Sequence, residues 1–294
     1  MTEKILIDSG SSGRGWSYFG EWNLCPTKWA RRHRPLGGGV IVPAADREEI
    51  DQELVALPLR KGSVTHTIQA HHYQSQLPDA DRYYSVKEAF QIASDKYKLN
   101  ASDASDIWAV YKAYLQHYKY DPWTPIAVEK LFKMSFDGVP YTMRVDLILE
   151  EKGKVHFSDH KTSSRVADSS YLKYALSGQF VAGELIGSKL YGTRWGGMVV
   201  NFLPSHARGE ITDSFKRVRM PPIPGMSGSV FKRQIIRIAS EIKYHDDHKT
   251  PLLEYPRAMH ESICVTAYGP CENYDACRWD LPIPEVEHES NNDL

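Results

Sequence analysis

The chain has 294 residues, of which 41% are apolar and 25% are charged, and its formal net charge is −1. This composition is that of an ordinary soluble globular protein. It excludes a global field that attracts nucleic acid, so binding to nucleic acid requires a local basic patch. The first residues lack the apolar core of a signal peptide, and no apolar run approaches the roughly 20 residues that cross a bilayer. The sequence therefore predicts a cytoplasmic protein whose four cysteines indicate metal or redox chemistry before disulfides.

Two short helices are expected near the N-terminus, over residues 17–34. Ser17 can cap the first helix, and Pro26 suits the first turn of the second, because proline lacks the N–H that a helix start leaves unbonded. Residues 40–60 are irregular, and a further helix is expected over 62–76.

Residues 84–118 have a mostly helical pattern, with a break after which Ser102 or Asp103 can cap a second helix. Amphipathic helices are also expected over 170–190 and 231–245. Runs of apolar and β-branched residues, one pair of which is joined by the hairpin signal Asp-Gly, indicate strands. The expected strands cover residues 124–136, 139–150, 154–160, 196–204 and 209–219.

These elements predict an α/β (or α+β) fold with a mixed central sheet flanked by helices. Residues 1–15 are expected to form a flexible N-terminus, and residues 283–294 a polar tail. Residues 16–282 are expected to form one domain, with a helical insertion at about 84–120.

An aspartate stands inside each of two neighbouring strand-like runs. Asp146 interrupts the apolar run MRVDLIL, and Asp159 lies in the next run after a short turn. Acidic residues are poor strand formers, and a buried charge is costly unless it is paired or binds a metal. Lys161 shares the sheet face of Asp159, because side chains alternate with a period of two. Two carboxylates suit Mg²⁺ or Mn²⁺, and an ammonium group can polarise a water or stabilise phosphate charge.

An exposed edge hairpin with a salt bridge between Asp159 and Lys161 is the alternative interpretation, since the tripeptide D-x-K is common. The apolar neighbours of Asp146 are not those of a surface strand. This context favours a metal site.

The same residues resemble the PD-(D/E)xK nucleases, and in particular their RecB-like branch. That branch shows G-[ST]-x-x-H on a helix, then G-x-[IV]-D on a strand, then D-x-K-T. Residues 62–66, GSVTH, resemble the first motif, and RVDLIL and SDHKTS resemble the other two. The resemblance implies a restriction-endonuclease-like core.

The resemblance also implies roles for individual residues. The implied metal ligands are His66, Asp146, Asp159 and the carbonyl of His160. Lys161 would orient the attacking water. Glu129, in AVEKLF, and Gln179, where a Q-x-x-x-Y helix signature begins, would lie at the catalytic site. Gly183 stands in place of the signature tyrosine, and Arg144 in place of the glycine two residues before the metal aspartate.

Cysteine is rare in this chain, and three of the four cysteines fall within 14 residues; they are Cys25, Cys264, Cys271 and Cys277. Four thiolates can complete a tetrahedral zinc site or a 4Fe–4S cluster, and the C-x-x-C knuckles common in zinc sites are absent. The arrangement resembles the iron staple of RecB-like nucleases such as AddB and the CRISPR-adaptation nucleases, with a longer first spacing. The resemblance implies a 4Fe–4S cluster joining both termini; zinc and four reduced cysteines are the alternatives.

Two runs are rich in basic residues. Residues 28–34, KWARRHR, contain Lys28, Arg31, Arg32 and Arg34, and residues 215–219, FKRVR, form the second run. Such clusters can neutralise phosphates, while aromatic side chains stack on unpaired bases. A solvated surface explains either run equally well.

Together these observations predict a Mg²⁺- or Mn²⁺-dependent DNA nuclease that hydrolyses phosphodiester bonds. By resemblance, the expected activity is that of a single-stranded DNA exonuclease acting on single strands or duplex ends. A helicase, recombination, CRISPR or phage partner and a bacterial or phage origin are implied on the same basis. The alternatives are a DNA-binding module that does not cut and a zinc-stapled structural protein.

Overall fold

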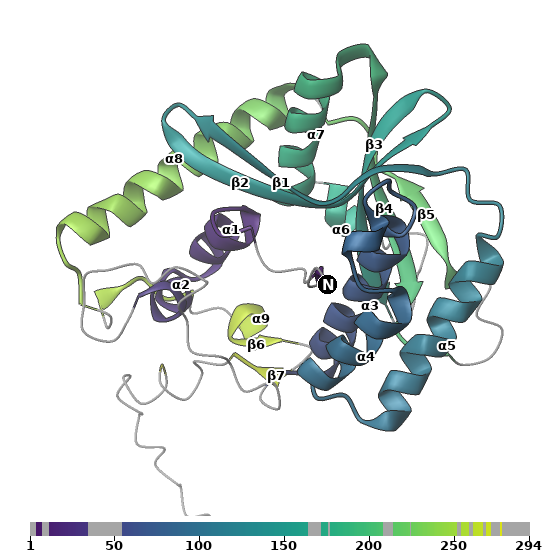
Figure 1. The fold of residues 1–294 in the computed structure, drawn as a ribbon. Coiled ribbons are helices and arrows are strands. Elements are labelled where there is room, and N and C mark those ends of the chain that lie inside the picture. The colour runs from purple at the N-terminus through teal and green to yellow at the C-terminus, as the bar shows by residue number, and fades with distance from the viewer. Residues whose placement is uncertain are drawn as a thin grey trace, which may run out of the picture. The chain divides into compact units, whose positions relative to one another are not determined.

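Runs of apolar and β-branched residues build a five-stranded mixed sheet in the computed structural model (Figure 1). Its strands, in sheet order, are β1 (Thr124–Phe136), β2 (Val139–Glu151), β3 (Lys154–Ser163), β4 (Trp195–Pro204) and β5 (Lys216–Arg219). β3 and β4 pair in parallel, and the other neighbours are antiparallel. The structure describes residues 4–7, 12–34, 55–163, 172–175, 177–207, 214–223, 225–251, 254–258, 261–266, 269–271 and 277.

The chain divides into two compact units. The first unit comprises Met1–Gly20 and Pro43–Glu241 and contains the sheet. The second unit comprises Glu21–Val42 and Ile242–Leu294, so it is built from both ends of the chain. The expectation of one domain over residues 16–282 stays a prediction.

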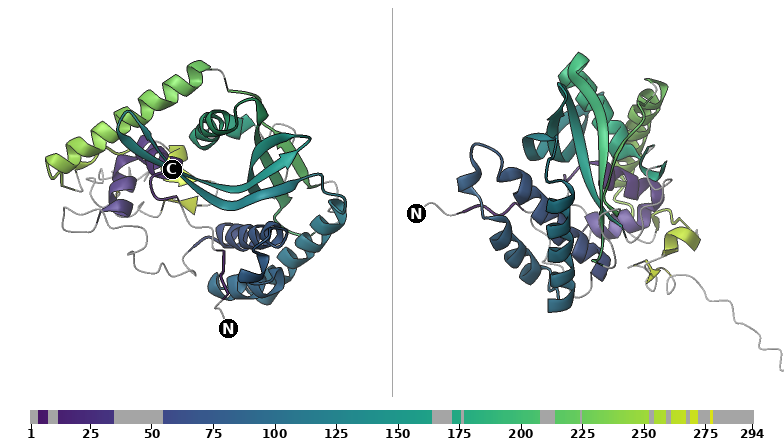
Figure 2. Two further views of the ribbon diagram at one scale, coloured as in Figure 1. Left: turned by 45° about the horizontal axis from the view of Figure 1, so that its top comes forward. Right: turned by 90° about the vertical axis from the view of Figure 1, so that its right-hand side faces the viewer.

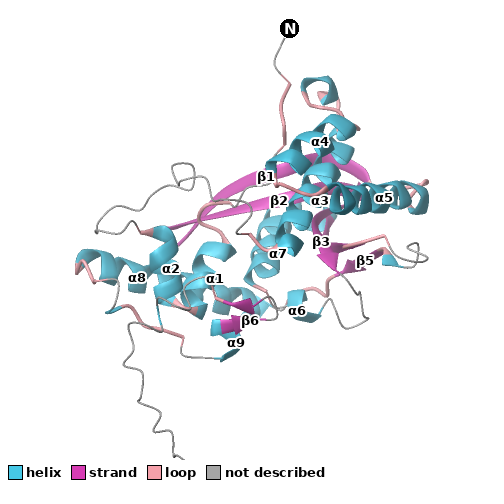
Figure 3. Cartoon of the chain, turned by 90° about the horizontal axis from the view of Figure 1, so that it is seen from below, coloured by secondary structure: helices cyan, strands magenta, loops and turns pink. Residues whose placement is uncertain are grey.

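Helices cover both faces of the sheet in the first unit (Figures 2 and 3). On one face lie α3 (Leu57–Gln74), α4 (Val86–Lys96) and α5 (Ala101–His117), and on the other lies α7 (Gly178–Tyr191). Tyr73 of α3 packs with the buried Leu147 and Leu149 of β2 and Val199 of β4. This packing of α3 on the sheet aligns the helix with the middle of β2.

Two predicted helix starts are wrong, and one is confirmed. α5 is capped by Asn100, whose side-chain oxygen accepts the N–H of Asp103 at 2.8 Å, so Asp103 and Ser102 lie in the first turn. α1 (Trp16–Leu24) begins at Trp16, which places Ser17 inside the helix. α2 (Pro26–His33) begins at Pro26, as predicted.

Other elements differ from their expected lengths. The helix expected over 170–190 is interrupted, with α6 (Leu172–Ala175) before α7, and Ser177 caps α7 by accepting the N–H of Phe180. α8 (Gly225–Asp247) is longer than predicted and β5 is shorter, while residues 208–213 lie outside the described residues. The remaining elements are η3 (Ala80–Arg82), η4 (Gly192–Arg194), α9 (Glu261–Cys264), β6 (Val265–Thr266) and β7 (Gly269–Pro270). Within the described ranges, no helix is both long and apolar enough to span a membrane.

Candidate active site

The site lies where strands β2 and β3 part. The two strands pair from Glu151↔Lys154 to Leu147↔Ser158, after which β3 continues along β4. Asp146 and Asp159 are the next residues on the two strands, and both line one pocket. The two carboxylates therefore come together at the point where the main-chain hydrogen bonds between β2 and β3 end.

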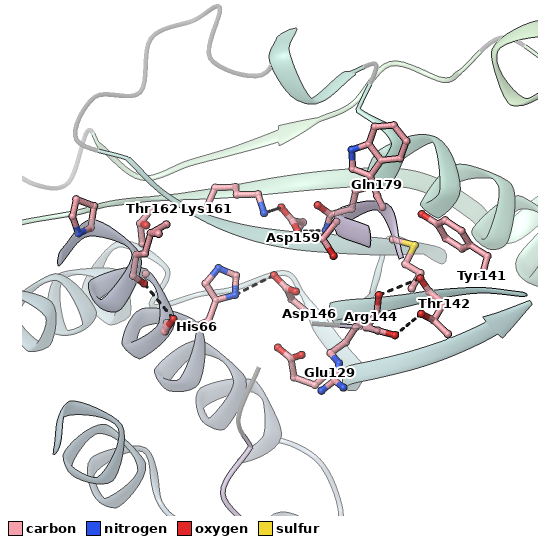
Figure 4. Close-up of a pocket in the computed structure, with 18 residues that line it drawn as sticks. His66, Glu129, Tyr141, Thr142, Arg144, Asp146, Asp159, Lys161, Thr162 and Gln179 are labelled. Carbon is pink, nitrogen blue, oxygen red and sulfur yellow. Dashed lines mark hydrogen bonds and ion pairs between the residues drawn. The ribbon is translucent and has the colours of Figure 1, made fainter. Parts of the chain in front are cut away.

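The pocket has a volume of about 530 Å³ and combines polar and apolar walls (Figure 4). Its lining side chains come from α1, α3, α7 and the first three strands. The charged and polar lining includes His66, Glu129, Arg144, Asp146, Asp159, Lys161 and Gln179, and the apolar lining includes Trp16, Pro58, Leu59, Tyr141 and Met143. A pocket of this size and mixed character is typical of ligand and substrate sites.

Asp146 is held by groups from two other elements. The main-chain N–H of His160 donates to Asp146 Oδ2 at 2.8 Å, and Nδ1 of His66 lies 3.4 Å from the same oxygen. Burial raises the pKa of Asp146, and the carboxylate of Asp159 raises it further, against the opposing effects of His66 and Lys161. A carboxylate with a raised pKa carries an incompletely compensated charge, which a bound cation would offset.

Three side chains form a group with the geometry of a metal site. The ligand atoms of His66, Glu129 and Asp146 lie within 4.8 Å of one another. Glu129 faces Asp146 across the β1–β2 pair and has a φ of +48°, a left-handed conformation that costs a non-glycine residue of order 1 kcal/mol. Two carboxylates and an imidazole are suitable ligands for Mg²⁺ or Mn²⁺. The donor set thus fits the divalent ion used by the nucleases that the motifs resemble.

Asp159 is engaged by two neighbours in this structure. Its Oδ2 lies 2.7 Å from Nζ of Lys161, and its Oδ1 accepts a hydrogen bond of 2.7 Å from Nε2 of Gln179. Burial acts to lower the pKa of Lys161, but the carboxylates of Asp159 and Asp146 outweigh it and raise that pKa above its ordinary value. Lys161 is therefore an ammonium group at neutral pH.

The structure gives a context for the two departures from the motif pattern, Gly183 in place of the tyrosine and Arg144 in place of the glycine. A Cβ atom at Gly183 would lie 2.4 Å from Sδ of Met198, so a tyrosine at this position would not fit against the sheet. Arg144, on the same strand as Asp146, lines the pocket and lies beside Glu129 (Figure 4). It adds a positive charge that a glycine would not supply.

The four cysteines all belong to the second unit and are half-buried. The main-chain N–H of Cys271 donates to the carbonyl of Cys264 at 2.7 Å. Burial raises the pKa of Cys277, and the thiols of Cys25 and Cys271 lie close enough to raise it further, while two arginines oppose them. No three cysteine sulfurs among the described residues lie within 4.8 Å of one another.

The basic residues of α2 are partly used in contacts within the second unit. Arg32 donates to Glu21 at 2.9 Å, and Arg34 forms an ion pair with Asp246. Trp29 is completely buried, so it cannot stack on a base from solvent. The side chain of Arg34 is 12% exposed, whereas that of Arg32 is 48% exposed. The DNA-binding roles of Lys28, Arg31, Arg32 and Arg34 stay a prediction.

Comparison with known proteins identifies the family. A model of the PD-(D/E)XK nuclease superfamily matches residues 21–200, more than half of the chain, so the protein belongs to this superfamily. The solved structure described as "Putative exonuclease" from Eubacterium rectale is 10% identical, with a TM-score of 0.44, and the match covers 92% of this chain and 90% of that chain. The structure of SSO0001 is 12% identical, with a TM-score of 0.28 and coverage of 70% and 83%. A search of curated proteins found no match.

Family and fold therefore agree with the sequence. The predicted superfamily is confirmed, and the mixed sheet flanked by helices confirms the predicted fold class. The family makes the protein a nuclease, and hence a phosphodiester hydrolase.

Trp16 is a pocket residue that sequence reasoning missed. A Cβ atom at Gly178 would lie 2.2 Å from the indole of Trp16, so the ring packs directly on the main chain beside Gln179. Nothing in the sequence links Trp16 to Gly178, because the two residues are far apart in the chain and meet only in the fold.

Replacing Asp146 by asparagine removes a half-buried charge and keeps the side-chain shape. In metal-free buffer at pH 7 we expect Asp146→Asn to raise the Tm by about 2–4 °C, the effect of about 1 kcal/mol in a chain of this size. Because the folded-state pKa of Asp146 is raised, its cost is absent below the unfolded-state pKa of about 3.9 and grows as the pH rises. Calorimetry should therefore find a Tm difference that disappears near this pH.

With Mn²⁺ present, wild type should have the higher Tm. The ion stabilises the folded state that binds it, and Asp146→Asn lacks one of the proposed ligands. Asp95→Asn, at an exposed position of α4, is the matched control and should change neither Tm. Equal Tm values for wild type and Asp146→Asn at every pH, with and without Mn²⁺, would contradict the prediction.

Proposed function

We propose that this protein is a Mg²⁺- or Mn²⁺-dependent deoxyribonuclease that hydrolyses single-stranded DNA from a strand end. The observation that carries the proposal is that one pocket contains both a metal-ligand group and an aspartate–lysine pair. The superfamily supports the chemistry, and the walls of the pocket support the choice of substrate.

The metal would be held by His66, Glu129 and Asp146, and we add Asp159 and the main-chain carbonyl of His160 to the proposed ligands. When bound, a divalent ion lowers the pKa of a coordinated water and neutralises phosphate charge. The three ligand carboxylates would surround the ion with negative charge, and the imidazole would contribute a neutral donor.

Lys161 acts in this proposal as a donor of positive charge and hydrogen bonds. Its raised pKa keeps it protonated at neutral pH, so it does not act as a general base. Its ammonium group can orient a water and stabilise the charge that develops on the phosphate. Gln179 holds Oδ1 of Asp159 and so leaves Oδ2 directed at Lys161.

Removing either kind of group should abolish cleavage. We expect Asp146→Ala, Asp159→Ala and Lys161→Ala each to lower kcat/KM on an end-labelled single strand in Mn²⁺ by at least about 100-fold, equivalent to about 2.7 kcal/mol of transition-state stabilisation. Lys189→Ala, at an exposed position of α7, should leave the rate unchanged. Substantial activity in either aspartate variant would rule out this site.

The preference for an unpaired strand rests on the apolar wall of the pocket. Trp16, Tyr141 and Met143 line the same cavity as the proposed metal ligands, and Leu59 at its edge is 61% exposed. An apolar and aromatic wall can take the face of an unpaired base, whereas the bases of a duplex are already stacked on one another. We infer that a base next to the scissile phosphate stacks on Trp16.

Trp16→Ala should therefore raise KM for single-stranded DNA by about 5–150-fold, the equivalent of about 1–3 kcal/mol of stacking. A strand with an abasic site at the stacked position should be cleaved as poorly by wild type, and combining it with Trp16→Ala should cause no further loss. Tyr120→Ala, which removes an aromatic residue that is 87% exposed and does not line the pocket, is the control. Additive losses, or equal cleavage of blunt duplex by wild type, would refute the stacking role.

We further propose that Cys25, Cys264, Cys271 and Cys277 bind a 4Fe–4S cluster, which would place the chain in the iron-stapled RecB-like branch. The support is that the fold of the second unit brings interacting thiols from both chain ends together. Four thiolates can complete a 4Fe–4S cluster or a tetrahedral zinc site. We propose the cluster because the order of the four cysteines in the sequence resembles the iron staple.

Anaerobically purified protein should accordingly be brown and contain about four iron and four sulfide ions per chain. Cys277→Ser should lose the colour and lower the Tm, because metal–ligand bonds contribute to folding. Asp146→Ala should keep the colour and the stabilising effect of the cluster, since it alters the proposed nuclease site and none of the cysteines. Colourless protein with stoichiometric zinc would refute the cluster without affecting the nuclease proposal.

A further inference from the structure

Arg217 of β5 lies in a buried cluster rather than on a DNA-binding surface. Its guanidinium carbon is 3.5 Å from the ring centroids of both Tyr118 and Trp123. Two of its nitrogens donate to Asp121, at 2.6 and 2.7 Å, and the arginine side chain is 12% exposed. The central arginine of the basic run 215–219 thus interacts with protein groups and holds a fixed orientation.

The same guanidinium begins a chain of hydrogen bonds across the first unit. Its Nη2 donates to the hydroxyls of Tyr114 and Tyr73, at 2.8 and 3.1 Å, and these hydroxyls are 2.5 Å apart. Nδ2 of Asn201 on β4 donates to Tyr114 at 3.2 Å and to Nδ1 of His160 at 2.9 Å. Asn201 and His160 are both buried.

One arrangement of hydrogens fits these contacts. Nη2 of Arg217 has two hydrogens, which can point at Asp121 and Tyr114, the nearest of its acceptors. The Tyr114 hydroxyl then accepts from Arg217 and Asn201 and donates to Tyr73, whose hydroxyl donates to Asp121 at 3.4 Å. The amide nitrogen of Asn201 faces Nδ1 of His160, so this ring nitrogen is an acceptor. The ring proton is then on Nε2, which has no hydrogen-bond partner among the described residues.

His160 connects this chain to the proposed metal site. Its ring stacks on Tyr73, with centroids 5.9 Å apart and planes at 3°. Its main-chain N–H donates to Oδ2 of Asp146 at 2.8 Å. Asn201 and Tyr73 hold the imidazole ring of His160 and so restrict the position of its main chain. The main-chain N–H in turn orients the carboxylate of Asp146.

We propose that Asn201 and Arg217 are positioning residues for the metal site, acting through Tyr114 and His160 on Asp146. Neither residue lines the pocket, so neither contacts the substrate. The catalytic part of this inference rests on the proposed nuclease function, whereas its metal-binding and ring-proton parts do not. Groups that orient metal ligands from outside the site change metal affinity or activity by about 10–100-fold when they are removed.

The direct test is Asn201→Leu, which removes the amide and keeps the branching and the number of side-chain heavy atoms. By calorimetric titration we expect the Kd for Mn²⁺ to rise about 10–100-fold. kcat should fall, while KM for a single strand stays near the wild-type value, because no DNA contact is lost. A long-range ¹H–¹⁵N spectrum of histidine rings, assigned with His160→Gln, should show the Nε2-protonated form in wild type and lose that pattern in the variant.

Ile107→Val is the matched control, because Ile107 lies in the separate cluster of α3, α4 and α5. It should lower the Tm while the Mn²⁺ affinity and the His160 signals stay at their wild-type values. Arg217→Lys is a second variant that keeps the charge but cannot donate to the tyrosines and Asp121 together. It should weaken Mn²⁺ binding in the same direction as Asn201→Leu, and by less.

Wild-type Mn²⁺ affinity in folded Asn201→Leu would overturn the proposal, as would an Nδ1-protonated His160 in the wild type. If Asn201→Leu does not fold, Arg217→Lys and Tyr114→Phe decide by the same two measurements. If wild type binds Mn²⁺ but cleaves no strand, the nuclease proposal fails, and the affinity and ring-proton measurements still decide the positioning roles.

Discussion

The approach of the half-buried Asp146 carboxylate to the buried carboxylate of Asp159 is the interaction on which the rest of the structure depends. Two like charges in a poorly solvated place are unfavourable unless cations and N–H donors surround them. Here the strand that carries Asp146 parts from its neighbour at this point, which leaves room for His66 from a helix and a main-chain N–H from β3. None of these partners is local to Asp146 in sequence. The site therefore forms only when the sheet and its flanking helices have packed.

Close packing around α7 serves the same site. Glycines at positions 178 and 183 let the helix approach Trp16 and Met198 to distances that any side chain would prevent. This approach brings Gln179 into contact with Asp159. On the opposite face of the sheet, a buried polar network joins Arg217, Asn201 and His160 through hydrogen bonds. The close packing of α7 thus positions the carboxylate of Asp159, and the polar network on the other face positions that of Asp146.

Sequence alone predicts much of this arrangement, and the limits have physical causes. Runs of apolar and β-branched residues predict strands β1 to β4. The period of two along a strand places Asp159 and Lys161 on one face. The α5 cap is missed because asparagine, serine and aspartate all cap well, and sequence does not say which residue leaves the helical conformation. The inward direction of Arg217 depends on Asp121, 96 residues away. The left-handed backbone of Glu129 likewise reflects its tertiary surroundings.

The second unit has a consequence for how the protein is made. Its N-terminal helix α2 is secured by Thr27, which donates to the carbonyls of Tyr255 and Pro256. During translation the ribosome produces α2 long before these carbonyls emerge, whereas domains generally fold as units in order of synthesis. Nascent chains therefore pass through a period in which the sheet can be complete while Trp22 still lacks its ring contacts with His245 and Tyr255. A chaperone that binds exposed apolar side chains should therefore act on this protein between the synthesis of α2 and that of residues 255–256.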